Sequence, residues 1–113
     1  MTTKELTTLI DAKVLVLGNE TADITCGYTC DLLSWVMAHG EPGMVWVTVQ
    51  THLNVIAVAV LSEMACVILP ESIEMEQESL EKASSEGMTV LSSPLSAYEI
   101  CGRLYAHGVP AYS

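Results

Sequence analysis

The fold is decided by residues 44–69, which read Met44-Val-Trp-Val-Thr-Val-Gln-Thr-His-Leu-Asn-Val-Ile-Ala-Val-Ala-Val-Leu-Ser-Glu-Met-Ala-Cys-Val-Ile-Leu69. The run 44–49 predicts a strand, and the continuously apolar run 66–69 predicts a strand covered on both faces. The segment 51–64 is rich in β-branched residues, yet a strand of about 14 residues would far exceed the usual five or six. Its apolar side chains also follow helical spacing, so we expect a largely buried helix.

The same alternation continues toward the C-terminus. The acid-rich segment 71–86 predicts an exposed helix that ends at Gly87, and 88–91 predicts the last strand. The final helix is expected to follow Ser92 and Ser93, with Pro94 in its first turn and Ser96 with Glu99 as a capping box. Helices between successive strands imply right-handed crossovers and a parallel sheet.

The first 40 residues add two helices and two strands. We expect a helix at 3–11 capped by Thr3, a strand at 13–18, a polar turn at 19–23 and a less clearly marked strand at 24–29. The two strands are expected to form a hairpin, and a helix capped by Asp31 is expected to extend to His39. The sequence thus predicts one α/β domain over 1–113, a three-layer α/β/α fold with a mixed, mostly parallel sheet of four or five strands.

Composition excludes several classes of protein. The chain has 113 residues, with 14 acids against four Lys or Arg, a net charge of -10 and 50% hydrophobic residues. Hydrophobicity this high is unlike a disordered chain, and four basic residues are too few for nucleic-acid binding. The longest unbroken apolar run, 55–61, is far shorter than the about 20 residues of a membrane span. We expect a cytoplasmic protein, with its four cysteines as free, mostly buried thiols.

The candidate site lies where the predicted parallel strands end, because ligands of open α/β sheets bind outside the carboxyl ends of their strands. Helix N-termini expected near Thr51 and Ser93 would favour an anion or a polar head group. The alternative is that Thr51, Ser93 and Asp31 are simply helix N-caps. The residues expected to bind a ligand are Gln50, Thr51, His52, Asn54, Ser92, Ser93, Thr29 and Asp31.

Motifs for catalysis are missing from the sequence. His39 and His107 are each followed by glycine, which is typical of a helix C-terminus, and only His52 lacks such an explanation. There is no phosphate-binding Walker sequence, dinucleotide fingerprint, nucleophile elbow or zinc-type cysteine spacing, so no cofactor and no metal are expected. The acid-rich segment 71–86 is expected to be a solvated face, or alternatively a docking surface for a basic partner.

Three blocks of the sequence, 26–37, 46–59 and 88–99, resemble small stand-alone DRTGG-domain proteins. That family is similar to the N-terminal domain of HPr kinase/phosphorylase, which has a three-layer α/β/α fold also similar to the UDP-binding domain of Mur ligases. The name-giving Asp-Arg and Gly-Gly pairs are absent, and the corresponding loops read Gln50-Thr-His-Leu-Asn54 and Pro70-Glu-Ser72. The kinase domain with its phosphate-binding loop is absent too, so kinase activity is not expected.

The resemblance implies a bacterial regulatory module that accompanies catalytic or CBS domains, with a regulatory kinase or a redox enzyme as partner. We therefore expect a non-enzymatic domain in which a small polar metabolite or nucleotide orders the loops 50–54 and 92–96 and changes association with a protein partner. A homodimer is expected, because the apolar content exceeds what so short a chain needs inside. The alternatives are a pure protein-interaction subunit without a ligand, and an enzyme that uses His52 with Gln50 or Asn54.

Overall fold

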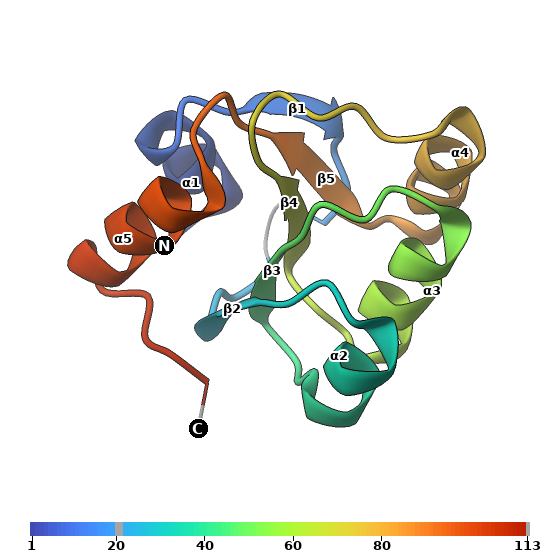
Figure 1. Ribbon diagram of the computed structural model, residues 1–113, viewed down its shortest axis with the longest axis horizontal. Coiled ribbons are helices and arrows are strands. Elements are labelled where there is room, and N and C mark those ends of the chain that lie inside the picture. The colour runs from blue at the N-terminus through green and yellow to red at the C-terminus, as the bar shows by residue number, and fades with distance from the viewer. Residues whose placement is uncertain (20–21, 113) are drawn as a thin grey trace.

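A computed structural model describes residues 1–19 and 22–112 of the chain (Figure 1). The described residues form five helices and five strands in one sheet, and the predicted fold class is confirmed. In chain order the elements are α1 (Thr3–Leu9), β1 (Lys13–Val16), β2 (Cys26–Thr29), α2 (Leu33–His39), β3 (Met44–Val47), α3 (Leu53–Leu61), β4 (Cys66–Leu69), α4 (Gln77–Glu86), β5 (Thr89–Ser92) and α5 (Ala97–Ala106).

The sheet has the strand order β1-β5-β4-β3-β2. Strands β2, β3, β4 and β5 run parallel, and β1 pairs antiparallel with β5 at one edge. The predicted hairpin between 13–18 and 24–29 is therefore wrong, since β1 and β2 lie at opposite edges of the sheet. Both strands find their partners in later parts of the chain, which a pattern of neighbouring strands cannot reveal. The expected turn at 19–23 includes residues 20–21, which lie outside the described residues.

Two hydrophobic cores explain why the central strands are apolar along their whole length. Figure 1 shows α2, α3 and α4 on one face of the sheet and α1 and α5 on the other. Met44 and Trp46 of β3 belong to the first core, while Val45 and Val47 belong to the second. The expectation of strands covered on both faces is thus confirmed, because alternate side chains of a strand point to opposite faces.

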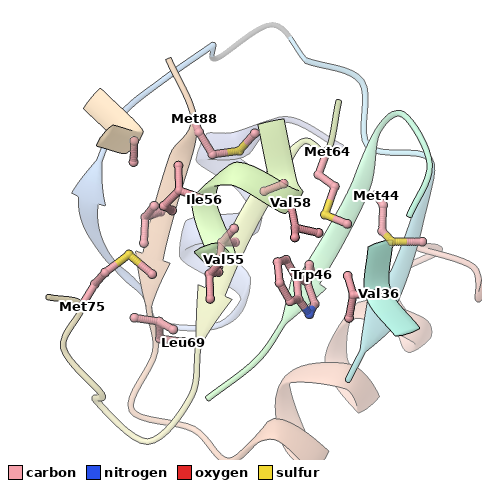
Figure 2. Close-up of a cluster of buried hydrophobic side chains, with 14 of the residues drawn as sticks. Val36, Met44, Trp46, Val55, Ile56, Val58, Met64, Leu69, Met75 and Met88 are labelled. Carbon is pink, nitrogen blue, oxygen red and sulfur yellow. The ribbon is translucent and has the colours of Figure 1, made fainter. Parts of the chain in front are cut away.

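The ambiguous segment 51–64 contains the helix α3, as its spacing predicts. Figure 2 shows Trp46 projecting from β3 between Val36 of α2 and Val58 of α3. The indole Nε1 of Trp46 donates a hydrogen bond of 2.9 Å to the carbonyl oxygen of Cys30, so the polar end of the buried ring is satisfied. This packing fixes the two helices against the strands whose ends carry the candidate site.

The helix starts differ from the predicted ones. The hydroxyl of Thr2, not Thr3, accepts the amide proton of Glu5 at the start of α1. The last helix begins after Ser96, whose Oγ accepts the amide proton of Glu99 at 3.2 Å, so Pro94 lies before the helix. Proline fits the first helical turn, but it also suits an extended segment that precedes a better cap.

The acid-rich helix is also shorter than predicted. It begins at Gln77, not Glu71, and ends as expected at Gly87, which has a left-handed conformation. Residues 70–73 form a tight turn in which the amide of Ile73 donates to the carbonyl of Pro70 at 3.1 Å. Glu71 and Ser72 have φ angles of 55° and 58° in this turn, so the chain cannot continue from β4 directly into a helix.

The two histidine helix ends are confirmed. Nδ1 of His39 lies 2.8 Å from the carbonyl oxygen of Trp35, and Nδ1 of His107 lies 2.9 Å from that of Arg103. Each ring thus contacts a carbonyl of the last turn of its own helix, as expected for a residue that satisfies a helix C-terminus.

Candidate functional site

Asp31 joins the two loops that follow β2 and β3. Its Oδ1 accepts a hydrogen bond of 2.8 Å from the hydroxyl of Thr48 and one of 3.0 Å from the amide of Val49. The side-chain amide of Gln50 donates back to the carbonyl of Asp31 at 3.0 Å. Asp31 is therefore not the cap of α2, whose N-cap is Leu32. It is an exposed carboxylate that holds two strand ends together.

The first turn of α3 lies beside this network. Its N-cap is His52, whose side chain makes no capping hydrogen bond, so the prediction of Thr51 as N-cap is wrong. The hydroxyl of Thr51 instead donates to Oε2 of Glu76 at 3.2 Å, and its carbonyl accepts from the hydroxyl of Ser79 at 2.8 Å. Asn54 is exposed in the first turn. The loop between β3 and α3 is thereby attached to α4.

The two serines after Leu91 are buried and already hydrogen-bonded. The hydroxyl of Ser92 donates to the carbonyl of Ile73 at 2.8 Å, and that of Ser93 donates to the carbonyl of Ile10 at 2.6 Å. Ser93 also accepts the amide proton of Leu95, so it stabilises a turn and is not the predicted helix cap. Both serines hold neighbouring backbone in place, whereas the loops after β2 and β3 present their polar groups to solvent.

Thr29 lies apart from the Asp31 network. Its hydroxyl donates to the carbonyl of Val47 at 3.0 Å, and the residue lines a cavity on the α5 side of the sheet. The structure thus places Asp31, Gln50, Thr51, His52 and Asn54 in two neighbouring loops, whereas the hydroxyls of Thr29, Ser92 and Ser93 are bonded to backbone carbonyls outside the Asp31 network.

Three residues of the site were missed by sequence reasoning. Thr48 is a lone polar residue at the end of an aliphatic strand, and that position is the one signal for it in the sequence. Glu76 and Ser79 were assigned to a solvated helix, because the start of α4 was placed too early. Three of the acids in 71–86, Glu71, Glu74 and Glu76, lie in the loop before α4, so the carboxyl end of the sheet is more acidic than predicted.

The four cysteines are free thiols. Complete burial raises the pKa of Cys66 to about 12, and burial together with a hydrogen bond to Glu41 raises the pKa of Cys26. Cys26 and Cys30 are four residues apart along an extended segment, which places their Cα atoms about 13 Å apart. A disulfide needs a Cα separation of about 4.4–6.8 Å, so these two thiols cannot pair within one chain.

The described residues contain no group of three or more His, Cys, Asp or Glu side chains arranged to hold a metal ion. No helix formed by residues 1–19 and 22–112 has both the length and the apolar character needed to cross a membrane.

Comparison with known proteins identifies one similar architecture. No family model matches the sequence, and no curated protein matches it. A solved structure is similar: the CBS and DRTGG domains of the regulatory region of Clostridium perfringens pyrophosphatase, complexed with the activator diadenosine tetraphosphate. The TM-score is 0.78 and the sequence identity is 13%. This chain has the fold of part of a regulatory region.

The match covers nearly all of this chain but only part of the solved structure. The alignment covers 96% of this chain but 47% of that chain, so the protein spans about half the length of the structure it matches. At this sequence identity the likeness concerns the fold. It supports the three-layer α/β/α architecture that the sequence predicts.

Proposed function

We propose that this chain is a DRTGG-type regulatory domain that senses a small polar ligand, with a nucleotide as the first candidate, and acts through a protein partner. The observation that carries the proposal is the Asp31 network, which joins two loops at the carboxyl ends of parallel strands. The likeness in fold to a regulatory region that binds a nucleotide activator supports it.

The turn after β4 adds support for the family. Glu71 and Ser72 stand in the loop that corresponds to the Gly-Gly pair of DRTGG domains, and both have positive φ angles. Glycine favours this backbone conformation, because it has no Cβ to clash. The chain therefore has, at residues 71–72, a backbone conformation that a Gly-Gly pair would adopt without steric cost.

Ligand binding is proposed to act through the loop between β3 and α3. Gln50, His52 and the first residues of α3 follow the carboxyl end of β3, and Gln50 is hydrogen-bonded to Asp31. A ligand that takes hydrogen bonds from Gln50 would compete with the carbonyl of Asp31. Because Thr51 is bonded to Glu76 and Ser79, a shift of this loop reaches α4.

The exposed acids of α4, Glu78, Glu81 and Glu86, then form the surface offered to a partner protein with basic residues. A regulatory kinase or a redox enzyme is the proposed class of partner, and the chain is proposed to act as a homodimer. The pure interaction subunit without a ligand remains the second candidate, because this acidic surface is present whether or not a ligand binds.

Catalysis by His52 is not part of the proposal. A histidine that acts as a base is normally oriented by a hydrogen-bonded partner and lies within reach of a nucleophile. Among the described residues no carboxylate or hydroxyl is hydrogen-bonded to the ring of His52. Its place before the first turn of α3 instead suits ligand recognition.

The first test measures the melting temperature with adenosine, adenosine monophosphate, diadenosine tetraphosphate, UDP-sugars and sugar phosphates. A ligand at 100 times its dissociation constant adds about 2.7 kcal/mol to the free energy of unfolding, which raises the melting temperature of a domain of this size by about 10 °C. The free amides at the start of α3 lead us to expect larger shifts with nucleotides than with adenosine. No shift with any of these compounds would leave the pure interaction subunit as the better proposal.

The site itself is tested with His52→Ala and Gln50→Ala. Both residues are only half-buried, so we expect folding to be retained and the ligand-induced shift to be lost. The matched control is His107→Ala, which removes an exposed histidine at the far end of α5. A ligand response that is unchanged in His52→Ala and Gln50→Ala would place the site elsewhere.

A further inference from the structure

A cavity of about 350 Å³ lies between α5, β2 and the C-terminal tail, away from the Asp31 network. Gly27, Thr29 and Val47 form its floor on the sheet, and residues from α5 and the tail form its walls. The α5 and tail residues are Cys101, Leu104, Tyr105, Val109, Pro110, Ala111 and Tyr112, with Tyr28 beside the floor. The cavity opens to solvent, and its size is that of a small ligand pocket.

The lining excludes a charged occupant. None of the residues that line the cavity is an acid, a lysine, an arginine or a histidine. The hydroxyl of Thr29 is already bonded to the carbonyl of Val47, so the floor offers little to hydrogen-bond. Water against this mostly apolar lining has few groups to hydrogen-bond, so its displacement by an apolar molecule is favourable. An apolar molecule would give up no hydrogen bonds when it moves from water into this cavity.

The tail that closes the cavity is held at two points. The amide of Gly27 donates to the carbonyl of Pro110 at 2.8 Å, which lays the tail along the edge of β2. The ring of Tyr112 meets that of Tyr28 edge to face, with centroids 5.1 Å apart. Figure 1 shows the tail leaving α5 on the β2 side of the sheet. The walls of the cavity are therefore formed without a bound ligand.

We propose that this cavity is a second binding site, which takes an uncharged small molecule with a planar ring. Its volume lies at the lower end of the about 300–1,000 Å³ typical of ligand pockets, which limits the occupant to one compact ring system. The ring of Pro110 and the largely exposed ring of Tyr105 supply flat apolar surfaces along this cavity. The proposal stands apart from the proposed site at Asp31.

Gly27 provides a direct test with indole as the probe. A methyl group added at Gly27 would lie 3.6 Å from a side-chain carbon of Val109, which is an ordinary contact, so Gly27→Ala fits and reduces the cavity. We expect indole to bind the natural chain, Gly27→Ala to bind it more weakly, and Cys101→Phe, which fills the cavity from α5, to weaken binding by about tenfold or more. Affinity is measured by calorimetry, and indole-3-acetate tests the exclusion of charge.

Gly102→Ala is the matched control. It makes the same chemical change on the open side of α5, where an added methyl group has no neighbour within 4 Å. We expect it to leave indole affinity unchanged. Equal indole affinity in Gly27→Ala, Cys101→Phe and the natural chain would overturn the proposal, as would equal binding of indole and indole-3-acetate.

The thiol of Cys101 reports whether the cavity itself is occupied. Cleavage after Lys82 and Arg103 places Cys101 in a different peptide from the other three cysteines, so its alkylation by iodoacetamide can be followed separately by mass spectrometry. We expect indole to slow alkylation of Cys101 in the natural chain and to leave the other cysteines unaffected. If indole does not protect Cys101, the proposal is overturned in favour of an empty cavity. If Cys101 becomes protected without indole as the protein concentration rises, it is overturned in favour of a cavity filled by a second copy of the chain.

Discussion

Asp31, Thr51 and Ser93 are residues that commonly cap helices, and each lies shortly before a helix that it does not cap. Each is close to a backbone group from another part of the chain that needs a partner. Asp31 accepts from the amide of Val49, and Ser93 donates to the carbonyl of Ile10. A cap satisfies a local helix amide, whereas these side chains satisfy groups brought close by the fold.

Cys66 gives a prediction at the same scale. Its pKa is raised from 9.0 to about 12 by burial, so in the pH range between these values the unfolded chain loses the thiol proton while the folded chain keeps it. The free energy of unfolding then falls as pH rises, by about 1.4 kcal/mol per pH unit from this group. Stability from this thiol is thus fully present below pH 9. Urea unfolding between pH 8 and 11 measures the slope.

Cys66→Ala tests the origin of that slope. The variant should be less stable at neutral pH, because it leaves a small void, but its stability should fall less steeply above pH 9. Val90→Ala is the control, since it makes a void in the buried neighbouring strand without removing a thiol. If Cys66→Ala keeps the full slope of the natural chain, the loss of stability at high pH comes from other groups.

Two elements, the helix α3 and the turn at 70–73, form against the conformational preference of their own residues. The helix forms from a run rich in valine, which prefers strands, because Val55, Ile56, Val58 and Ala59 then pack against the sheet together. The turn keeps two residues at positive φ, because three hydrogen bonds hold it. The amides of Glu71 and Ser72 donate to the carbonyls of Leu95 and Ser93, and Ser92 donates to Ile73.

Ser72→Gly is therefore expected to stabilise the protein. Glycine adopts the φ of 58° without a steric cost, so the free energy of unfolding should rise by about 0.5–1 kcal/mol. The control is Ser84→Gly, the same substitution on the exposed side of α4, which should lower stability by a similar amount. Chemical denaturation measures both. If Ser72→Gly is less stable than the natural chain, the stabilisation from the Ser72 side chain exceeds the steric cost of its positive φ.

In the molecule as a whole, the region of α2 leaves a group of apolar side chains exposed. The short helix α2 buries only Val36 fully, and Leu32, Trp35 and Met37 remain more than half exposed. On the other face, α5 lies over the sheet together with the C-terminal tail. Exposed apolar groups of this kind occur where a protein meets a partner, so α2 is the surface on which we base the expected homodimer.

Sedimentation over a wide range of protein concentration tests this expectation. We expect the natural chain to sediment as a dimer and Met37→Lys to sediment as a monomer, because a charge in an apolar interface is left without a partner. Tyr98→Lys is the control, since Tyr98 is 90% exposed on α5, a helix that lies on the opposite face of the sheet from α2. A monomer at every concentration for the natural chain would show the homodimer prediction to be wrong.

Patterns along the chain were enough to predict the α/β class, the alternation of strands and helices after residue 44, a helix within 51–64 and the two histidine helix ends. These features depend on residues close together in the chain, where periodicity and capping chemistry act directly.

Only the tertiary structure decided the partners of β1 and β2, the turn after β4, the roles of Asp31 and Ser93, and the cavity beneath the C-terminal tail. Each of these depends on groups that are far apart in the chain and meet only in the folded state. Local preference cannot rank such contacts, because their stability comes from pairing and burial that exist only once the sheet has formed.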